Sequence, residues 1–81
     1  MRLPRGLSGD DLVKKLSEFG YEATRQTGSH IRLTRTTGEG SHHVTIPRHG
    51  ALGVGTLSAI LREVSSQLGI EKAELARKIL K

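Results

Sequence analysis

Apolar residues recur at helical spacing in two long stretches of the chain. The first predicts a helix over about residues 8–19, with an apolar stripe at Leu12, Val13, Leu16 and Phe19. The second predicts a helix over about residues 56–68, with a stripe at Leu57, Ile60, Leu61, Val64 and Leu68. Ser8 can cap the first helix, and Asp11 then falls at its third position, close to the capping-box pattern. A short helix is expected over about residues 71–80.

The middle of the chain alternates between apolar and polar residues, which is the pattern of half-buried β-strands. It predicts strands over about residues 21–25, 29–35 and 42–46, and Pro47 ends the last of them. A three-stranded antiparallel sheet with one apolar face needs cover on that face, and the two long helices supply it. We therefore expect one α+β domain over residues 1–81. Its α-β-β-β-α order, with an extra C-terminal helix, is that of a double-stranded-RNA-binding-domain-like (dsRBD-like) fold.

The turn at Gln26-Thr27-Gly28 allows two pairings of the first strand with the second. A two-residue loop would place Arg25 opposite His30. A three-residue loop, with Gly28 in the left-handed position of a bulge, would place Thr24 opposite His30. We prefer the second pairing because it puts apolar residues together on one face and an opposite-charge pair on the other. Its further pairs are Ala23 with Ile31, Tyr21 with Leu33, and Glu22 with Arg32.

The same alternation assigns the side chains of the second strand to the two faces of the sheet. Its apolar residues face the helices, so His30, Arg32 and Thr34 point to the open face. On the third strand, the same alternation places His43 and Thr45 on that face. If Arg32 pairs with Thr45 on the third strand, His30 comes level with Pro47. The residues from 36 to 41 are expected to form a flexible polar loop.

The charge is unevenly distributed along the chain. The net charge is +5, from 13 Lys and Arg against 8 Asp and Glu. Between Arg25 and His49 lie four arginines, all four histidines and a single acid, Glu39, which favours a polyanionic partner. The chain has no cysteine, no apolar run of membrane-spanning length and no signal-peptide pattern, so we expect a cytoplasmic protein without disulfides and without membrane contact.

His30 is the residue most suited to chemistry. An exposed histidine is usually only a polar surface residue, but this one follows the Gly28-Ser29 turn and shares a face with Arg32. Imidazole transfers protons near neutral pH, and guanidinium groups bind phosphate. The combination favours phosphodiester transfer from a ribose 2′-hydroxyl, with His30 as the catalytic group. We expect Gly28 and Ser29 to support the site, and the candidate phosphate contacts are Arg25, Arg32, Arg48 and His49, the last also a candidate second proton carrier.

Other kinds of site are poorly supported. His42 and His43 are adjacent on a strand and point to opposite faces, so they cannot easily share a metal ion with His49. We expect no metal and no cofactor. The glycines between residues 50 and 55 lack the Gly-Lys-Ser/Thr element of a phosphate loop. The second long helix carries only Arg62 on its polar side, which argues against DNA reading by that helix.

Several short motifs together resemble the HicA toxins of bacterial and archaeal toxin–antitoxin pairs. They are Gly20-Tyr21, Arg25-Gln26-Thr27-Gly28-Ser29-His30, Thr45-Ile46-Pro47-Arg48-His49 and Gly55-Thr56-Leu57 with Ile60-Leu61. The resemblance covers about residues 3–70. Two features depart from the family pattern: the segment 50–54 lacks the acid that HicA sequences often carry there, and the tail 71–81 is longer than in the shortest members.

The resemblance implies a dsRBD-like fold and an mRNA interferase, a metal-independent endoribonuclease that blocks translation. The catalytic histidine of this family is that of Gly-Ser-His, hence His30. The resemblance also implies a cognate HicB-like antitoxin that binds the toxin and covers its active site. Two alternatives remain: a non-catalytic RNA-binding module on the same fold, and a decayed toxin that acts only within its antitoxin complex.

Overall fold

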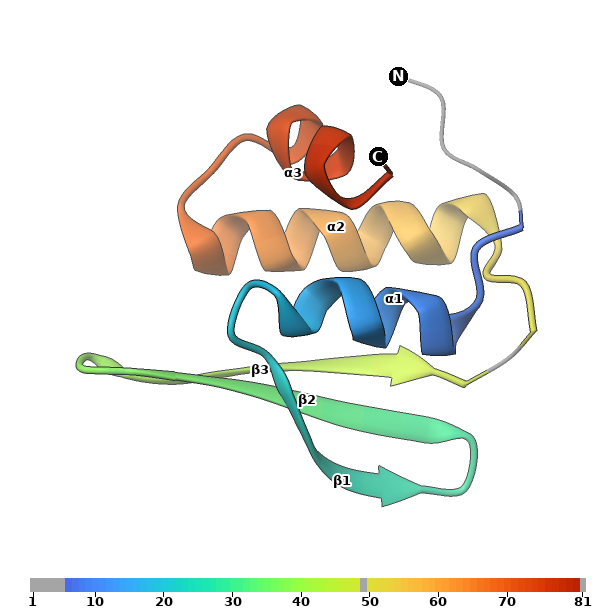
Figure 1. Ribbon diagram of the computed structural model, residues 1–81, viewed down its shortest axis with the longest axis horizontal. Coiled ribbons are helices and arrows are strands. Elements are labelled where there is room, and N and C mark those ends of the chain that lie inside the picture. Colours follow the sequence, from blue (N-terminus) through green and yellow to red (C-terminus); the bar gives the residue numbers. More distant parts are fainter. Residues whose placement is uncertain (1–5, 49, 81) are drawn as a thin grey trace.

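Three antiparallel strands form one sheet in the order β1–β2–β3, in a computed structural model that describes residues 6–48 and 50–80. The elements are, in chain order, α1 (Gly9–Ser17), β1 (Glu22–Thr27), β2 (His30–Thr37), β3 (Gly40–Pro47), α2 (Val54–Leu68) and α3 (Lys72–Ile79). This order confirms the α+β class and the α-β-β-β-α arrangement with a C-terminal helix. Helices α1 and α2 lie over one face of the sheet, and α3 lies on the far side of α2 (Figure 1).

Local hydrogen bonds set the start of α1. The Ser8 hydroxyl accepts a 3.0 Å hydrogen bond from the amide of Asp11, and the Asp11 carboxylate accepts a 3.3 Å bond from the amide of Ser8. The predicted capping box is therefore confirmed. These bonds from Ser8 hold the pKa of Asp11 below its usual range. The helix ends at Ser17, two residues before the predicted end, and the chain turns at Gly20, whose φ is 93°.

The later helices begin and end within two residues of the prediction. Helix α2 begins at Val54 rather than at 56, because Gly53 already acts as its N-cap and accepts a 2.9 Å bond from the amide of Leu57. It ends as predicted at Leu68, where Gly69 takes the left-handed conformation with a φ of 70°. Helix α3 lacks one residue at each end of its predicted range. Within the described part of the chain, no helix is both long and apolar enough to span a bilayer.

The hydrophobic core lies between the sheet and the helices. Where they lie under the helices, strands β2 and β3 bury alternate side chains, as the sequence pattern predicts. The sheet contributes Ile31, Leu33, Val44 and Ile46, and the helices α1 and α2 contribute Leu12, Leu16, Leu57, Ile60, Leu61 and Val64. On the other side of α2, α3 buries Leu75, Ala76 and Ile79. Among the residues that the structure describes, none forms a helix on the opposite face of the sheet.

Gln67 of α2 joins three parts of the fold through its side-chain amide. The buried hydroxyl of Tyr21 donates a 2.6 Å hydrogen bond to Oε1 of Gln67. Nε2 of Gln67 donates a 2.9 Å bond to the backbone carbonyl of His43 in β3. Burial raises the pKa of the Tyr21 hydroxyl. The contact therefore ties α2 both to the segment before β1 and to the sheet.

Strand β1 pairs with β2 differently from both predicted registers. Gly28 and Ser29 form a two-residue loop, so Thr27 lies opposite His30, where Arg25 or Thr24 was expected. Gly28 has a φ of 58°, which confirms its predicted left-handed conformation, but the bulge is elsewhere in the strand. The prediction is wrong because it assigned Gln26 and Thr27 to the turn, whereas both pair with β2.

The bulge of β1 is at Thr24, where the pairing shifts by one residue. On one side of it Arg25 lies opposite Arg32, and on the other side Ala23 lies opposite Leu33. The expected pair of Glu22 with Arg32 is therefore absent, and Glu22 lies opposite Thr34. All six residues of β1 are exposed, so burial of apolar side chains cannot fix the register of this strand.

The pairing of β2 with β3 confirms the prediction. Arg32 lies opposite Thr45, and His30 lies opposite Pro47. The loop between these strands is shorter than the expected residues 36–41, because β2 continues through Thr37 and β3 begins at Gly40. The resulting hairpin extends beyond the ends of α1 and α2 (Figure 1).

Candidate active site

His30 is the first residue of the central strand and lies on the open face of the sheet. Its side chain is exposed. It is flanked by one residue from each neighbouring strand, Thr27 on β1 and Pro47 on β3. The two-residue loop of Gly28 and Ser29 reverses the chain immediately before His30, and the expected support of the site by these two residues stays a prediction.

The backbone around His30 is held from the side of β3 and α1. The amide of Arg48 donates a 2.5 Å hydrogen bond to the carbonyl of Ser29. The first residue of α1, Gly9, lies so close to this segment that an added Cβ would be 2.0 Å from the carbonyl oxygen of Pro47. The sequence gives no signal for the close approach at Gly9, because it depends on how α1 is placed over the sheet.

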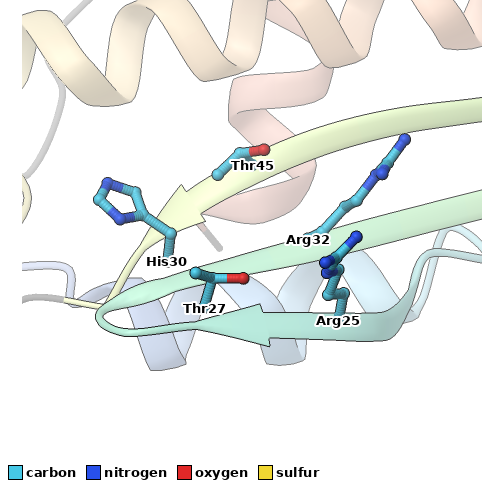
Figure 2. Close-up of a pocket in the computed structure, with 5 residues that line it drawn as sticks. All are labelled: Arg25, Thr27, His30, Arg32 and Thr45. Atoms are coloured by element: carbon cyan, nitrogen blue, oxygen red, sulfur yellow. The ribbon is translucent and has the colours of Figure 1, made fainter.

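The open face is hollowed beside His30. The hollow has a volume of about 240 Å³, and its lining comes from all three strands: Arg25, Thr27, His30, Arg32 and Thr45. Figure 2 shows His30 at one end of the group and both arginines at the other, with the two threonines between them. Thr27 was expected in the turn, and the register of β1 is what brings it into the site.

The structure brings together two of the four candidate phosphate contacts. Arg25 and Arg32 lie directly opposite each other on β1 and β2 and line the hollow. Arg48 does not line it, because its Nε donates a 3.0 Å hydrogen bond to Oδ1 of Asp10 in α1, as part of an exposed ion pair. His49 lies outside the described residues.

A row of hydroxyl groups crosses the open face next to the hollow. The hydroxyl of Thr34 lies 2.7 Å from that of Thr24 on β1 and 3.0 Å from Nδ1 of His43 on β3. His43 is therefore on the open face, as predicted, and is already engaged by a neighbour. Alternation along the strands indicated Thr34 and Thr45 on this face, but Thr24 depends on the bulge.

The lining of the hollow is suited to an anion. Its charged side chains are two guanidinium groups, no carboxylate takes part, and two hydroxyl groups can donate further hydrogen bonds. An imidazole at one end adds a group that can accept or donate a proton. This set of side chains can bind the phosphate backbone of a nucleic acid and transfer a proton beside it.

Comparison with known proteins identifies a family. A family model described as HicA toxin of bacterial toxin-antitoxin matches residues 9–65. No curated protein and no solved structure matches the chain. The matched range contains α1, the three strands and most of α2, and hence every residue that lines the hollow, while α3 lies outside it.

Proposed function

The chain belongs to the HicA family of toxins from bacterial toxin–antitoxin systems, and on this premise we propose that it is an endoribonuclease. Its substrate is mRNA, its reaction is metal-independent, and its catalytic residue is His30. The observation that carries the proposal is the position of His30: an imidazole at the end of a hollow whose other lining groups are two arginines and two threonines.

In this reaction, His30 acts at the edge of a bound phosphodiester. As a general base it removes the proton from a ribose 2′-hydroxyl, and the 2′-oxygen attacks the adjacent phosphorus. The bond from phosphorus to the 5′-oxygen breaks, and that oxygen takes a proton from water or from the protonated imidazole. The products are a 2′,3′-cyclic phosphate and a free 5′-hydroxyl. The positive charge of Arg25 and Arg32 attracts the RNA backbone to the site.

The test of this function is the His30→Ala variant. We expect loss of RNA cleavage in vitro and loss of growth arrest in cells that express the protein without an antitoxin. Because His30 is exposed, the free energy of unfolding should change by no more than about 0.5 kcal/mol.

His43→Ala is the matched control for this test, because it removes an exposed imidazole from the same face of the sheet and should leave cleavage intact. Growth arrest by His30→Ala would show that His30 is not the catalytic group. RNA that binds the wild type but stays uncut would instead favour an RNA-binding module without catalysis.

We also propose that a HicB-like antitoxin binds this protein and covers the hollow. An adjacent open reading frame for such a protein, and its co-purification with this chain, would support the proposal. In that complex, the antitoxin should block RNA binding by the wild type. If RNA still binds with the antitoxin in place, the antitoxin does not cover the hollow.

A further inference from the structure

The cross-strand pair of Arg25 and Arg32 brings two like charges directly opposite each other. Such a pair normally destabilises a sheet, because the charges repel at short range. It becomes favourable when an anion binds between them. The structure shows how little of this charge is neutralised within the protein.

No carboxylate of the described residues forms an ion pair with either arginine. The ion pairs in the part of the chain that the structure describes are Arg48 with Asp10 and Lys78 with Glu74. The acid of β1, Glu22, lies beyond the bulge at Thr24 and opposite Thr34. Arg25 and Arg32 therefore keep their guanidinium donors available for a ligand.

The arginine pair is displaced from His30 along the sheet. Arg32 follows His30 by two residues on the same strand, so the two backbone positions are separated by about 6.8 Å. Figure 2 shows the side chains in the same order, with Thr27 and Thr45 between the imidazole and the two guanidinium groups. Successive phosphates of an extended RNA strand can lie along this row, one beside His30 and the next beside the arginine pair.

We propose that Arg25 and Arg32 form a phosphate subsite that binds the phosphate next to the one that is cleaved at His30. This proposal rests on the proposed ribonuclease function only in saying which linkage is cleaved. Binding of a phosphate by the two arginines does not depend on that function. Thr45, directly opposite Arg32, adds a hydroxyl donor to the same phosphate.

Among the described residues, no Phe, Tyr or Trp is placed to stack on bases at this face. The chain has a single Tyr, a single Phe and no Trp; Tyr21 is buried and Phe19 packs against the core. Stacking on aromatic side chains is the usual way to hold single-stranded bases. We therefore expect the protein to bind the RNA strand mainly through its phosphates.

The experiment uses short oligodeoxynucleotides that carry a single ribose, so that cleavage is confined to one linkage. Each neighbouring linkage is replaced in turn by an uncharged methylphosphonate. With the wild-type protein, neutralising one neighbouring phosphate should lower kcat/KM by about tenfold, as expected for loss of charge-assisted hydrogen bonds. The double variant Arg25→Gln/Arg32→Gln should lose about as much activity on the charged substrate and show no further loss on the neutral one. Arg62→Gln, which removes an exposed charge from α2, should behave as wild type.

A second arm needs no cleavage, and it separates failure of the subsite from failure of the proposed function. Binding of an all-ribose oligonucleotide to His30→Ala is measured against salt concentration. Adding the two arginine substitutions should lower the slope of log K against log salt by about 0.7 for the lost phosphate contact. If the double variant matches Arg62→Gln in both arms, the subsite is overturned. If the slope changes while no protein cleaves, the ribonuclease function fails and the subsite stands.

Discussion

The amide of Arg48 donates a 2.5 Å hydrogen bond to the carbonyl of Ser29, and so joins the end of β3 to the turn that precedes His30. Pro47, the residue before Arg48, lies opposite His30 in the sheet and against Gly9 of α1. The position of the histidine therefore depends on the packing of a helix on the opposite face.

Substitution of Gly9 by alanine tests this dependence. The added Cβ would lie 2.0 Å from the Pro47 oxygen, so α1 or the end of β3 must move. We expect a loss of about 1–3 kcal/mol in the free energy of unfolding, the usual cost of overpacking. We also expect a reduced cleavage rate in the protein that remains folded. Urea denaturation and single-turnover cleavage measure the two effects.

The matched control for this prediction is Gly6→Ala. An added Cβ at Gly6 meets no atom within 4 Å, so both measurements should stay near the wild-type values. Equal behaviour of the two variants would mean that the segment at Pro47 yields to the extra methyl group, and that Gly9 has no part in placing His30.

The ion pair of Arg48 with Asp10 competes with RNA for the guanidinium group. Asp10→Asn removes a negative charge and releases Arg48, so we expect tighter RNA binding with a steeper salt dependence. Stability should fall by less than about 1 kcal/mol, because the pair is exposed. Glu63→Gln removes an exposed acid from α2 and controls for net charge. If both variants tighten binding equally, Arg48 has no special contact with RNA.

Ionisation of Tyr21 should make the fold sensitive to alkaline pH. Burial raises its pKa above the usual value near 10. An unfolded chain therefore ionises first, and the stabilisation by the neutral hydroxyl is complete below about pH 10 and lost as pH rises through the folded-state pKa.

The Tyr21→Phe variant isolates this effect from the titration of other groups. At neutral pH it should be less stable by about 1 kcal/mol, because Gln67 loses its hydrogen-bond donor. Above pH 10 the difference between variant and wild type should shrink. Chemical denaturation between pH 8 and pH 11 measures it, and a constant difference across that range would contradict the prediction.

Helix α3 lies outside the range matched by the family, yet it should contribute to stability. Leu75 is fully buried, and the Lys72 ammonium donates a hydrogen bond to the hydroxyl of Ser58 in α2. We expect Leu75→Ala to cost about 2–5 kcal/mol, as for other buried leucines. Lys78→Ala, an exposed change on the same helix, should stay within about 0.5 kcal/mol. Thermal or urea unfolding compares them.

The sequence predicted the parts of the site that the core determines. Ile31 and Leu33 alternate with His30 and Arg32, and burial of the first two fixes the direction of the others. Pro47 ends the pairing of β3 at a defined place, and the predicted register of β2 with β3 is therefore correct.

The parts that the sequence did not predict depend on exposed groups. No side chain of β1 is buried, so the hydrophobic pattern of the sequence predicts neither the two-residue loop nor the bulge at Thr24. The direction of Arg48 is likewise set by Asp10, an acid 38 positions away in the chain. Such a contact can be found only once α1 is placed over the sheet.

Because β1 is exposed, its residues can contribute to RNA binding without also contributing to the hydrophobic core. His30 and Arg32 lie on a strand that also supplies Ile31 and Leu33 to the core, so changes at those two positions are costly to folding. Arg25 and Thr27 stand on a strand from which the core takes no side chain. Mutations in β1 can therefore alter how RNA is held at little cost to folding. Substitutions in β1 and substitutions at the buried positions of β2 should therefore differ in their effect on stability.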